Sequence, residues 1–351
     1  MNFSKKINQI RRTITRSLTS KIGFSSPYQQ KYKTIQPNEV KTILLSRPNA
    51  RVGNLLLITP LIQELTAVFP NCTIDVLLKG SVGPVLFKNY DAIQNIISLP
   101  GKPFKQLKTY LGVWISLREK HYDVAINVDF ESSSGRLSTR FSNATYKFFG
   151  DINDEIKSKF TDYEHIAKYP IYSLRQSLAQ LGLPENNNPI PNLALKLSPS
   201  ELDLGKEMLQ KMVGNDQKTI CIFTYATGEK CLSELWWNDF YSQMKSEYPK
   251  YNIVEILPKE NCSKINFKAP SFYSKDLREM GAVLANSSIF IGADSGIMHL
   301  ASAVHIPTIG LFSVSKSTKY QPYNTKSVSF DAEKYTVNDC ITIVKSVLTA
   351  S

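Results

Sequence analysis

The residues best suited to chemistry in this 351-residue chain lie between positions 289 and 303, where an apolar run is followed by a small polar turn. The apolar run predicts a buried strand that ends at Gly292, and a helix is expected to open at Ser295 or Gly296. The first N–H groups of a helix lack partners within the helix and lie at the positive end of its dipole. The segment therefore predicts a phosphate-binding turn.

Two further side chains of this segment are placed to contact a sugar nucleotide. Asp294 is expected at the carboxyl end of the strand, where a carboxylate accepts hydrogen bonds from sugar hydroxyls. His299 follows about one helical turn into the helix, within reach of the nucleotide side. The alternative is an ordinary capped helix, in which Asp294 or Ser295 is the N-cap and His299 is a half-buried structural side chain.

Two other segments follow predicted strands and carry polar groups of the same kind. After the first strand, Gly53 permits a tight turn and close backbone approach, and Asn54 is a candidate N-cap. In the second half of the chain, Thr227 and Lys230 are placed to hold phosphate oxygens, the hydroxyl as donor and the ammonium as a point charge. The alternatives are a structural turn with its cap in the first case and a solvated loop in the second.

Motifs of several other protein classes are absent from the sequence. No GxGxxG follows the first strand of either half and no GxxxxGK[ST] occurs, which argues against a dinucleotide dehydrogenase and a P-loop NTPase. Neither HExxH nor a paired-histidine spacing is present, so no metal site is predicted. The five widely spaced cysteines argue against a disulfide framework and favour a reducing, cytoplasmic compartment. No apolar stretch reaches the roughly 18 residues of a membrane-spanning helix.

Apolar runs alternate with helical patterns, which predicts parallel strands covered by helices on both faces. Strands are expected at 43–46, 74–78, 95–99, 123–128 and 145–149, and again at 219–224, 253–257, 288–291 and 308–312. The first of the expected helices covers 55–69. A stretch with three prolines and three asparagines at 184–191 is typical of a domain linker. We therefore predict an α/β protein with two Rossmann-like, doubly wound domains, 39–184 and 192–351, facing a central cleft.

The net charge of +12 is concentrated at the N-terminus, because residues 1–38 hold eight lysines and arginines and no acid. Apolar residues recur there every three to four positions, which predicts a basic amphipathic helix able to lie on an anionic membrane surface. The alternatives are a helix that packs on its own domain and, less favoured, a mitochondrial transit peptide. Nucleic-acid binding is not predicted, because the rest of the chain is only mildly basic and carries no zinc-finger or aromatic RNA-binding motif.

Together these segments resemble glycosyltransferase family 9, the ADP-heptose:lipopolysaccharide heptosyltransferases. The second half matches the family signature D-[ST]-G-x-x-H-L-A at Asp294–Ala301, and the first half matches its opening turn at Gly53-Asn54 and Thr59-Pro60-Leu61. Weaker likenesses lie at 121–127, 132–136, 307–312 and 320–322. The resemblance extends from about residue 41 to about residue 325.

The resemblance implies a two-domain GT-B fold and metal-independent, inverting transfer from a nucleotide-diphosphate sugar, with no cofactor. It also implies roles for residues of the second domain. Thr227 and Lys230 would contact the diphosphate, and the donor would be held by Asp294, Ser295, Gly296 and His299.

One departure from the family concerns the general base. The family turn carries an Asp that looks like the base for the acceptor hydroxyl, and this chain has Asn54 there. A neutral amide orients a hydroxyl but takes no proton, and a missing base costs ~10²–10⁴ in rate. Asp129 and Glu131, just after the fourth predicted strand, are the candidate replacements. The basic residue of the family's acceptor-side turn is also displaced, because Pro48 stands in its place.

Arg47 and Arg51 lie near that displaced position, so Arg51 and Gly53 are expected on the acceptor side. The leading hypothesis is an inverting glycosyltransferase that adds heptose or a related sugar to a lipopolysaccharide core or similar glycolipid. It would act in the cytoplasm, at the inner face of the inner membrane of a Gram-negative cell. The alternative, motivated by Asn54, is a catalytically silent sugar-nucleotide-binding or scaffold protein. A third hypothesis places another inverting GT-B activity on the same donor cleft.

Overall fold

The computed structural model describes residues 34–101 and 105–349, and these divide into two compact units. Unit 1 comprises 34–50, Pro60–Pro84 and Tyr90–Pro191, and unit 2 comprises Arg51–Thr59, Val85–Asn89 and 192–349. Two short segments from the first half of the chain therefore belong to the second unit. Most of the basic segment predicted over 1–38 lies outside the described residues.

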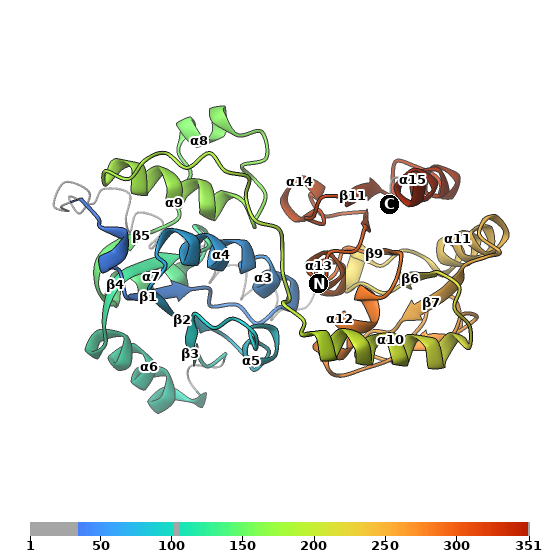
Figure 1. The fold of residues 1–351 in the computed structure, drawn as a ribbon, viewed down its shortest axis with the longest axis horizontal. Coiled ribbons are helices and arrows are strands. Elements are labelled where there is room, and N and C mark those ends of the chain that lie inside the picture. Colours follow the sequence, from blue (N-terminus) through green and yellow to red (C-terminus); the bar gives the residue numbers. More distant parts are fainter. Residues whose placement is uncertain (1–33, 102–104, 350–351) are drawn as a thin grey trace. The chain divides into compact units, whose positions relative to one another are not determined.

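Unit 1 is built on a five-stranded parallel sheet with the strand order β3-β2-β1-β4-β5 (Figure 1). Its strands are β1 (Thr42–Ser46), β2 (Thr73–Leu78), β3 (Ile93–Ser98), β4 (His121–Asn127) and β5 (Asn143–Phe148). Its helices are α4 (Thr59–Val68), α6 (Leu107–Glu119), α7 (Ser133–Phe141), α8 (Asp154–Lys159) and α9 (Tyr169–Gln180), after the short 3₁₀ helix η1 (Pro37–Glu39). The short helix α5 (Gly83–Leu86) begins in unit 1 and ends in unit 2.

Unit 2 is built on a six-stranded parallel sheet with the order β11-β10-β9-β6-β7-β8. Its strands are β6 (Thr219–Phe223), β7 (Asn252–Ile256), β8 (Ser271–Phe272), β9 (Ile289–Ala293), β10 (Thr308–Phe312) and β11 (Val328–Asp331). Its helices are α3 (Val52–Leu56), α10 (Pro199–Val213), η3 (Gly228–Lys230), α11 (Glu234–Glu247), α12 (Leu277–Ala285), α13 (Gly296–Ala303), α14 (Ser317–Tyr320) and α15 (Val337–Thr349).

Burial on both faces explains why the central strands read as continuous apolar runs. In β1 the successive residues Ile43, Leu44 and Leu45 are all fully buried, although their side chains alternate between the faces of the sheet. Leu44 packs in a cluster with Leu117 of α6. In unit 2 the sheet packs against α11 and α15 in one core. Two parallel sheets covered by helices are the α/β class predicted from the sequence.

The first predicted helix differs from the structure in its start and its continuity. A single helix was expected over 55–69, whereas α3 begins at Val52 and a separate α4 begins at Thr59. Pro60 has no N–H to donate to the preceding turn, so the hydrogen-bond ladder stops there. Because Arg51 occupies the N-cap position, Asn54 lies inside α3 and is not its cap. Strands β8 and β11, which are short and lie at the two edges of the sheet, were not predicted.

None of the helices in the described residues is both long enough and apolar enough to cross a membrane.

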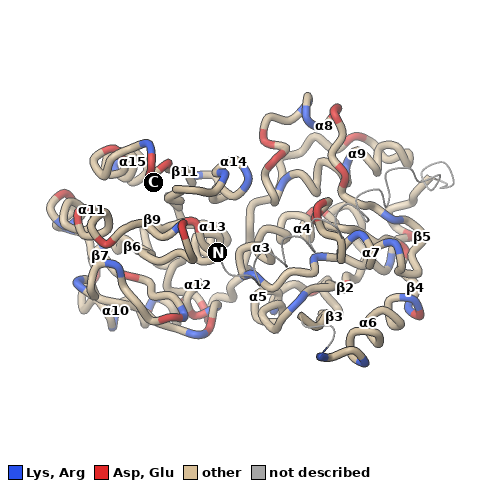
Figure 2. Tube along the Cα trace, turned by 180° about the vertical axis from the view of Figure 1, so that it is seen from behind, with Lys and Arg blue, Asp and Glu red and all other residues tan. Residues whose placement is uncertain are grey.

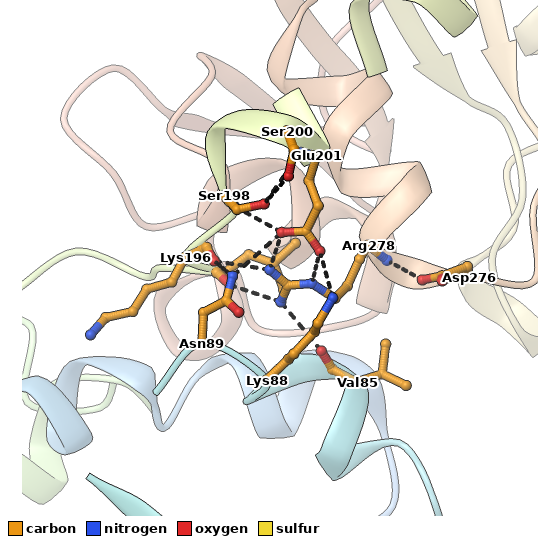
Figure 3. A network of polar contacts seen from close by, with 10 residues as sticks. Val85, Lys88, Asn89, Lys196, Ser198, Ser200, Glu201, Asp276 and Arg278 are labelled. Carbon is orange, nitrogen blue, oxygen red and sulfur yellow. Dashed lines mark hydrogen bonds and ion pairs between the residues drawn. The ribbon is translucent and has the colours of Figure 1, made fainter. Parts of the chain in front are cut away.

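A buried arginine joins three segments of unit 2 that are far apart in the sequence (Figure 3). The guanidinium of Arg278 in α12 donates to both carboxylate oxygens of Glu201 in α10, at 2.6 and 2.7 Å. It also donates to the backbone carbonyls of Val85, Leu195 and Lys196. The arginine side chain is 5 % exposed, so a bidentate ion pair of this kind is expected to fix the geometry of all three segments.

Neutralising Glu201 is expected to reduce stability in a pH-dependent way. Hydrogen bonds from Arg278 hold the pKa of Glu201 well below its usual value of 4.5. The Glu201→Gln variant leaves the buried guanidinium without its counter-charge, and we expect it to lose about 3 kcal/mol of unfolding free energy at neutral pH. Because folding lowers the pKa of this carboxyl group, its ionisation stabilises the folded state above pH 4.5. This stabilisation decreases progressively as the pH falls below 4.5 towards the pKa of the folded state. The difference between wild type and variant should therefore shrink at acidic pH.

Urea unfolding from about pH 7 to about pH 3 would measure this difference. Glu207→Gln is the matched control, because Glu207 is an exposed residue of the same helix. Equal pH dependence in wild type and the Glu201→Gln variant would show that the ion pair does not contribute.

Close contact between α10 and α12 depends on Gly205. A Cβ at this position would lie 2.3 Å from the backbone carbonyl carbon of Ala282, which cannot move without shifting α12. We expect Gly205→Ala to lower the free energy of unfolding by about 3 kcal/mol through overpacking. In contrast, a Cβ added at Gly112 in α6 has no atom within 4 Å. Gly112→Ala should therefore raise the free energy of unfolding by about 0.8 kcal/mol, because alanine has the higher helix propensity. Thermal or urea unfolding distinguishes the two, and equal effects would contradict the packing argument.

Candidate functional site

The sequence-predicted donor residues meet where the strand order of unit 2 reverses. The sheet runs outward from β6 through β7 to β8 on one side and from β9 through β10 to β11 on the other, so β6 and β9 flank the switch point. In doubly wound sheets, ligands bind outside the carboxyl ends of the strands at such a point. The loop after β6 carries Thr227 and Lys230, and the turn after β9 carries Asp294 and Ser295.

An ion pair between a partly exposed lysine and a buried carboxylate bridges the two loops. The ammonium of Lys230 donates to Oδ2 of Asp294, and the hydroxyl of Ser315 donates to the same oxygen. Asp294 is 6 % exposed, whereas the Lys230 side chain is 35 % exposed. Both hydrogen bonds are accepted by Oδ2, so they fix the orientation of the whole carboxylate and therefore also the position of Oδ1.

The N-terminus of α13 lies next to this pair. Ser295 is the N-cap, and its hydroxyl accepts a hydrogen bond from the backbone N–H of Met298 at 3.3 Å. The two residues between them, Gly296 and Ile297, belong to the first helical turn, whose N–H groups have no acceptor within the helix. The ion pair and the helix N-terminus therefore present a cation, a carboxylate and a positive dipole end side by side.

Close packing between α3 and α13 explains why glycine occupies positions 53 and 296. A Cβ on Gly53 would lie 2.7 Å from Cδ2 of His299, and a Cβ on Gly296 would lie 3.2 Å from the backbone nitrogen of Gly53. His299 is buried, and its ring edge packs against the first turn of α3. Asn54 lies half-buried in this same turn, and Arg51 is its exposed N-cap. The opening turn from the first half of the chain thus lies against the signature helix of the second half.

A second lysine lies near the ion pair. The ammonium groups of Lys230 and Lys319 each lie 5.9 Å from the centroid of the ring of Tyr320, the last residue of the short helix α14, which follows β10. Thr227 is an exposed residue at the N-cap of η3, the short helix that ends at Lys230. These residues place two positive charges and a hydroxyl at the same edge of the sheet, a donor set that suits phosphate oxygens.

A buried hydrogen bond positions the loop after β6. The hydroxyl of Thr224 donates to Glu255 in β7 at 2.6 Å and accepts from the backbone N–H of Lys264 at 3.1 Å. Burial raises the pKa of Glu255, although the hydroxyls of Ser263 and Thr224 oppose the shift. The bond therefore fixes the base of the loop that carries Thr227 and Lys230.

The two candidate replacement bases, Asp129 and Glu131, lie in unit 1. They follow β4, which neighbours β1 at the switch point of that sheet. Oδ2 of Asp129 forms an ion pair with the buried Arg47, and its Oδ1 accepts the backbone N–H of Glu131 at 3.1 Å. Glu131 is half-buried in the same turn. The structure therefore groups the other predicted site residues in unit 2 and leaves these two acids in unit 1.

Sequence reasoning did not assign Ser315 and Lys319 to the unit 2 cluster, and it noted Tyr320 only within the weaker family likeness at 320–322. The available signal was the position of the loop after β10, because the carboxyl end of this strand meets the same sheet edge as those of β6 and β9. Among the described residues, no three His, Cys, Asp or Glu side chains are grouped so that they could hold a metal ion.

Comparison with known proteins supports the family and the fold. The family model described as glycosyltransferase family 9 (heptosyltransferase) matches residues 274–347, which contain the signature helix. Lipopolysaccharide heptosyltransferase 3 of Escherichia coli strain K12 is 24 % identical over 303 residues, covering 81 % of this chain and 86 % of that protein. These matches confirm the resemblance to glycosyltransferase family 9 and the expectation that the chain is a glycosyltransferase.

Solved structures confirm the fold class. A family 9 glycosyl transferase from Veillonella parvula DSM 2008 has a TM-score of 0.71 at 15 % identity, covering 91 % of this chain and 99 % of that one. An Escherichia coli heptosyltransferase solved with ADP-2-deoxy-2-fluoro heptose has a TM-score of 0.60 at 14 % identity, with 87 % and 99 % coverage. The GT-B type of α/β fold is thus confirmed.

Proposed function

We propose that this protein transfers heptose or a related sugar from a nucleotide-diphosphate donor to a lipopolysaccharide core or a similar glycolipid. The observation that carries the proposal is the Lys230–Asp294 ion pair beside the N-terminus of α13, at the switch point of the unit 2 sheet. ADP-heptose is the first candidate donor, because a structurally similar heptosyltransferase was solved with an ADP-heptose analogue.

The donor diphosphate is assigned to the cationic side of this cluster. Lys230 and Lys319 supply positive charge, Thr227 supplies a hydroxyl donor, and the first turn of α13 supplies N–H groups. Charge accumulates on the diphosphate as the bond to the sugar breaks, so these groups stabilise the leaving group more strongly in the transition state than in the ground state. No step of this kind needs a metal ion.

The sugar is assigned to the carboxylate side. Asp294 is held through Oδ2, which leaves Oδ1 oriented to accept from sugar hydroxyls, while Ser295 and Gly296 allow close approach at the helix tip. His299 packs against Gly53 and so links the donor residues to the turn that carries Arg51 and Asn54. We assign Arg51 and Gly53 to the acceptor side.

The proposed reaction is a direct displacement. An acceptor hydroxyl oxygen attacks the anomeric carbon on the face opposite the diphosphate, which leaves with the electron pair of the broken bond. The configuration at that carbon is inverted, and the hydroxyl proton passes to a general base. Asn54 cannot take this proton. We assign the proton to Glu131, one of the two acids that follow β4, and keep Asp129, the ion-pair partner of the buried Arg47, as the second candidate.

The absence of a carboxylate at position 54 also supports a second candidate function, a silent protein that binds a sugar nucleotide without turning it over. Such a protein would keep the donor cluster of unit 2 and lose only the proton acceptor. Release of nucleoside diphosphate in the presence of membrane glycolipid separates the two functions, since only the enzyme produces it.

We further propose a cytoplasmic location with peripheral attachment at the inner face of the inner membrane. The glycolipid acceptor would be reached there, and the basic segment over residues 1–38 would add attraction to anionic lipid.

Isothermal titration calorimetry of the full chain against a panel of nucleotide sugars tests the donor assignment. We expect ADP-heptose to bind more tightly than sugars carried on uridine or guanosine diphosphate. Failure of every nucleotide sugar to bind would overturn both candidate functions.

A further inference from the structure

Helix α6 in unit 1 leaves a stripe of large apolar side chains uncovered. Leu107, Leu111 and Ile115 are 53, 51 and 56 % exposed, and their spacing of four residues places them on one face of the helix. The opposite face is fixed in the fold, because Leu117 is fully buried in a core cluster with residues of β1 and β2. The stripe is therefore held at the surface by the packing of the rest of the helix.

The apolar surface continues from α6 onto α7. Phe141, at the end of α7, is 54 % exposed and meets Trp114 of α6 edge to face at 5.7 Å. Trp114 in turn contacts Tyr110 at 6.0 Å. Helices α6 and α7 thus present a shared apolar face with aromatic side chains, which favour the boundary between water and lipid.

Positive charge surrounds this face. Lys105 lies just before α6, Lys108 in its first turn and Arg118 at its end, and Figure 2 shows Lys and Arg at both ends of the helix. Arg140 precedes Phe141, and the ammonium of Lys147 donates to the backbone carbonyl of Arg140 at 2.7 Å. Burial lowers the pKa of Lys147, and the charges of Arg118 and Arg140 lower it further. Glu119 is the only acid within α6.

We propose that this surface, formed by Leu107, Leu111, Ile115 and Phe141 with their basic rim, docks on an anionic lipid bilayer. An apolar helix face with lysines and arginines beside it lies in the headgroup region, where the apolar side chains leave water and the cations meet lipid phosphates. A second copy of the chain fits less well, because a twofold pairing would bring each basic rim against itself. The surface is separate from residues 1–38 and does not depend on the proposed reaction.

Peptide-resolved hydrogen exchange of the full chain tests the surface directly. With vesicles of phosphatidylglycerol and phosphatidylethanolamine, we expect slower exchange in peptides that cover 105–119 and 138–147, and no change with phosphatidylcholine alone. Three results would overturn the proposal: slowing confined to other peptides, including those from residues 1–33, equal slowing with phosphatidylcholine, or slowing that appears without vesicles as protein concentration rises.

A variant pair provides the second measurement. In vesicle co-sedimentation, the L111S/I115S variant should partition about tenfold less into the anionic vesicles, because two apolar side chains no longer leave water. The matched control is L204S/L235S, which replaces two exposed leucines of α10 and α11 in unit 2 and should bind as wild type does. Equal binding of the wild type and the L111S/I115S variant would contradict docking through α6, whatever the transferase activity.

Discussion

Replacement of Asp294 by alanine is expected to weaken donor binding by about 10²-fold or more. The substitution removes the carboxylate assigned to the sugar hydroxyls and leaves Lys230 and Ser315 without the oxygen to which they donate. Truncating one partner of a buried, hydrogen-bonded charge pair typically costs 2–5 kcal/mol, roughly 30-fold to several-thousand-fold in affinity. Calorimetric titration with ADP-heptose measures the loss.

Two further variants separate this effect from general damage. Asp331→Ala makes the same change at the carboxyl end of the edge strand β11 and should leave donor affinity unchanged. Ser315→Ala removes only one of the two donors to Asp294 and should have a smaller effect than Asp294→Ala. If a folded Asp294→Ala variant bound the donor as tightly as the wild type, the assignment of the donor site would be wrong.

Glu131→Gln is expected to lower kcat by about 10²–10⁴ while donor affinity stays unchanged. The amide keeps the size of the side chain but cannot accept the acceptor proton, so only the chemical step loses its base. Steady-state kinetics with a glycolipid acceptor, together with calorimetry for the donor, separates the two quantities.

The Asp129→Asn variant tests the second candidate base. It breaks the ion pair with the buried Arg47, so we expect it to lower the free energy of unfolding. In the protein that remains folded, we expect kcat to change little. Asn54→Asp restores the acid that the family has at that position. If this change raised turnover while Glu131→Gln and Asp129→Asn had no effect on kcat, neither of the two acids would be the base.

Local patterns were sufficient to predict the two sheets. The central strands are buried on both faces, so their sequences are continuous apolar runs that stand out from the helices between them. The signature turn could also be predicted from the local sequence, because a strand, a small polar pair and a helix follow one another within 289–303. The edge strands β8 and β11 were missed because they are short and only partly buried, so little apolar patterning marks them.

The partners of the predicted residues, in contrast, were decided by the tertiary structure. The bond from Ser315 to Asp294 joins residues 21 positions apart, and the packing of Gly53 on His299 joins the two halves of the chain. Nothing local in the sequence encodes such contacts, because they depend on which strands become neighbours and on the direction in which each loop leaves the sheet. For the same reason, the sequence did not show whether the apolar stripe of α6 is buried or exposed. An apolar face is expected to be buried, and only the assembled unit shows which apolar face remains at the surface.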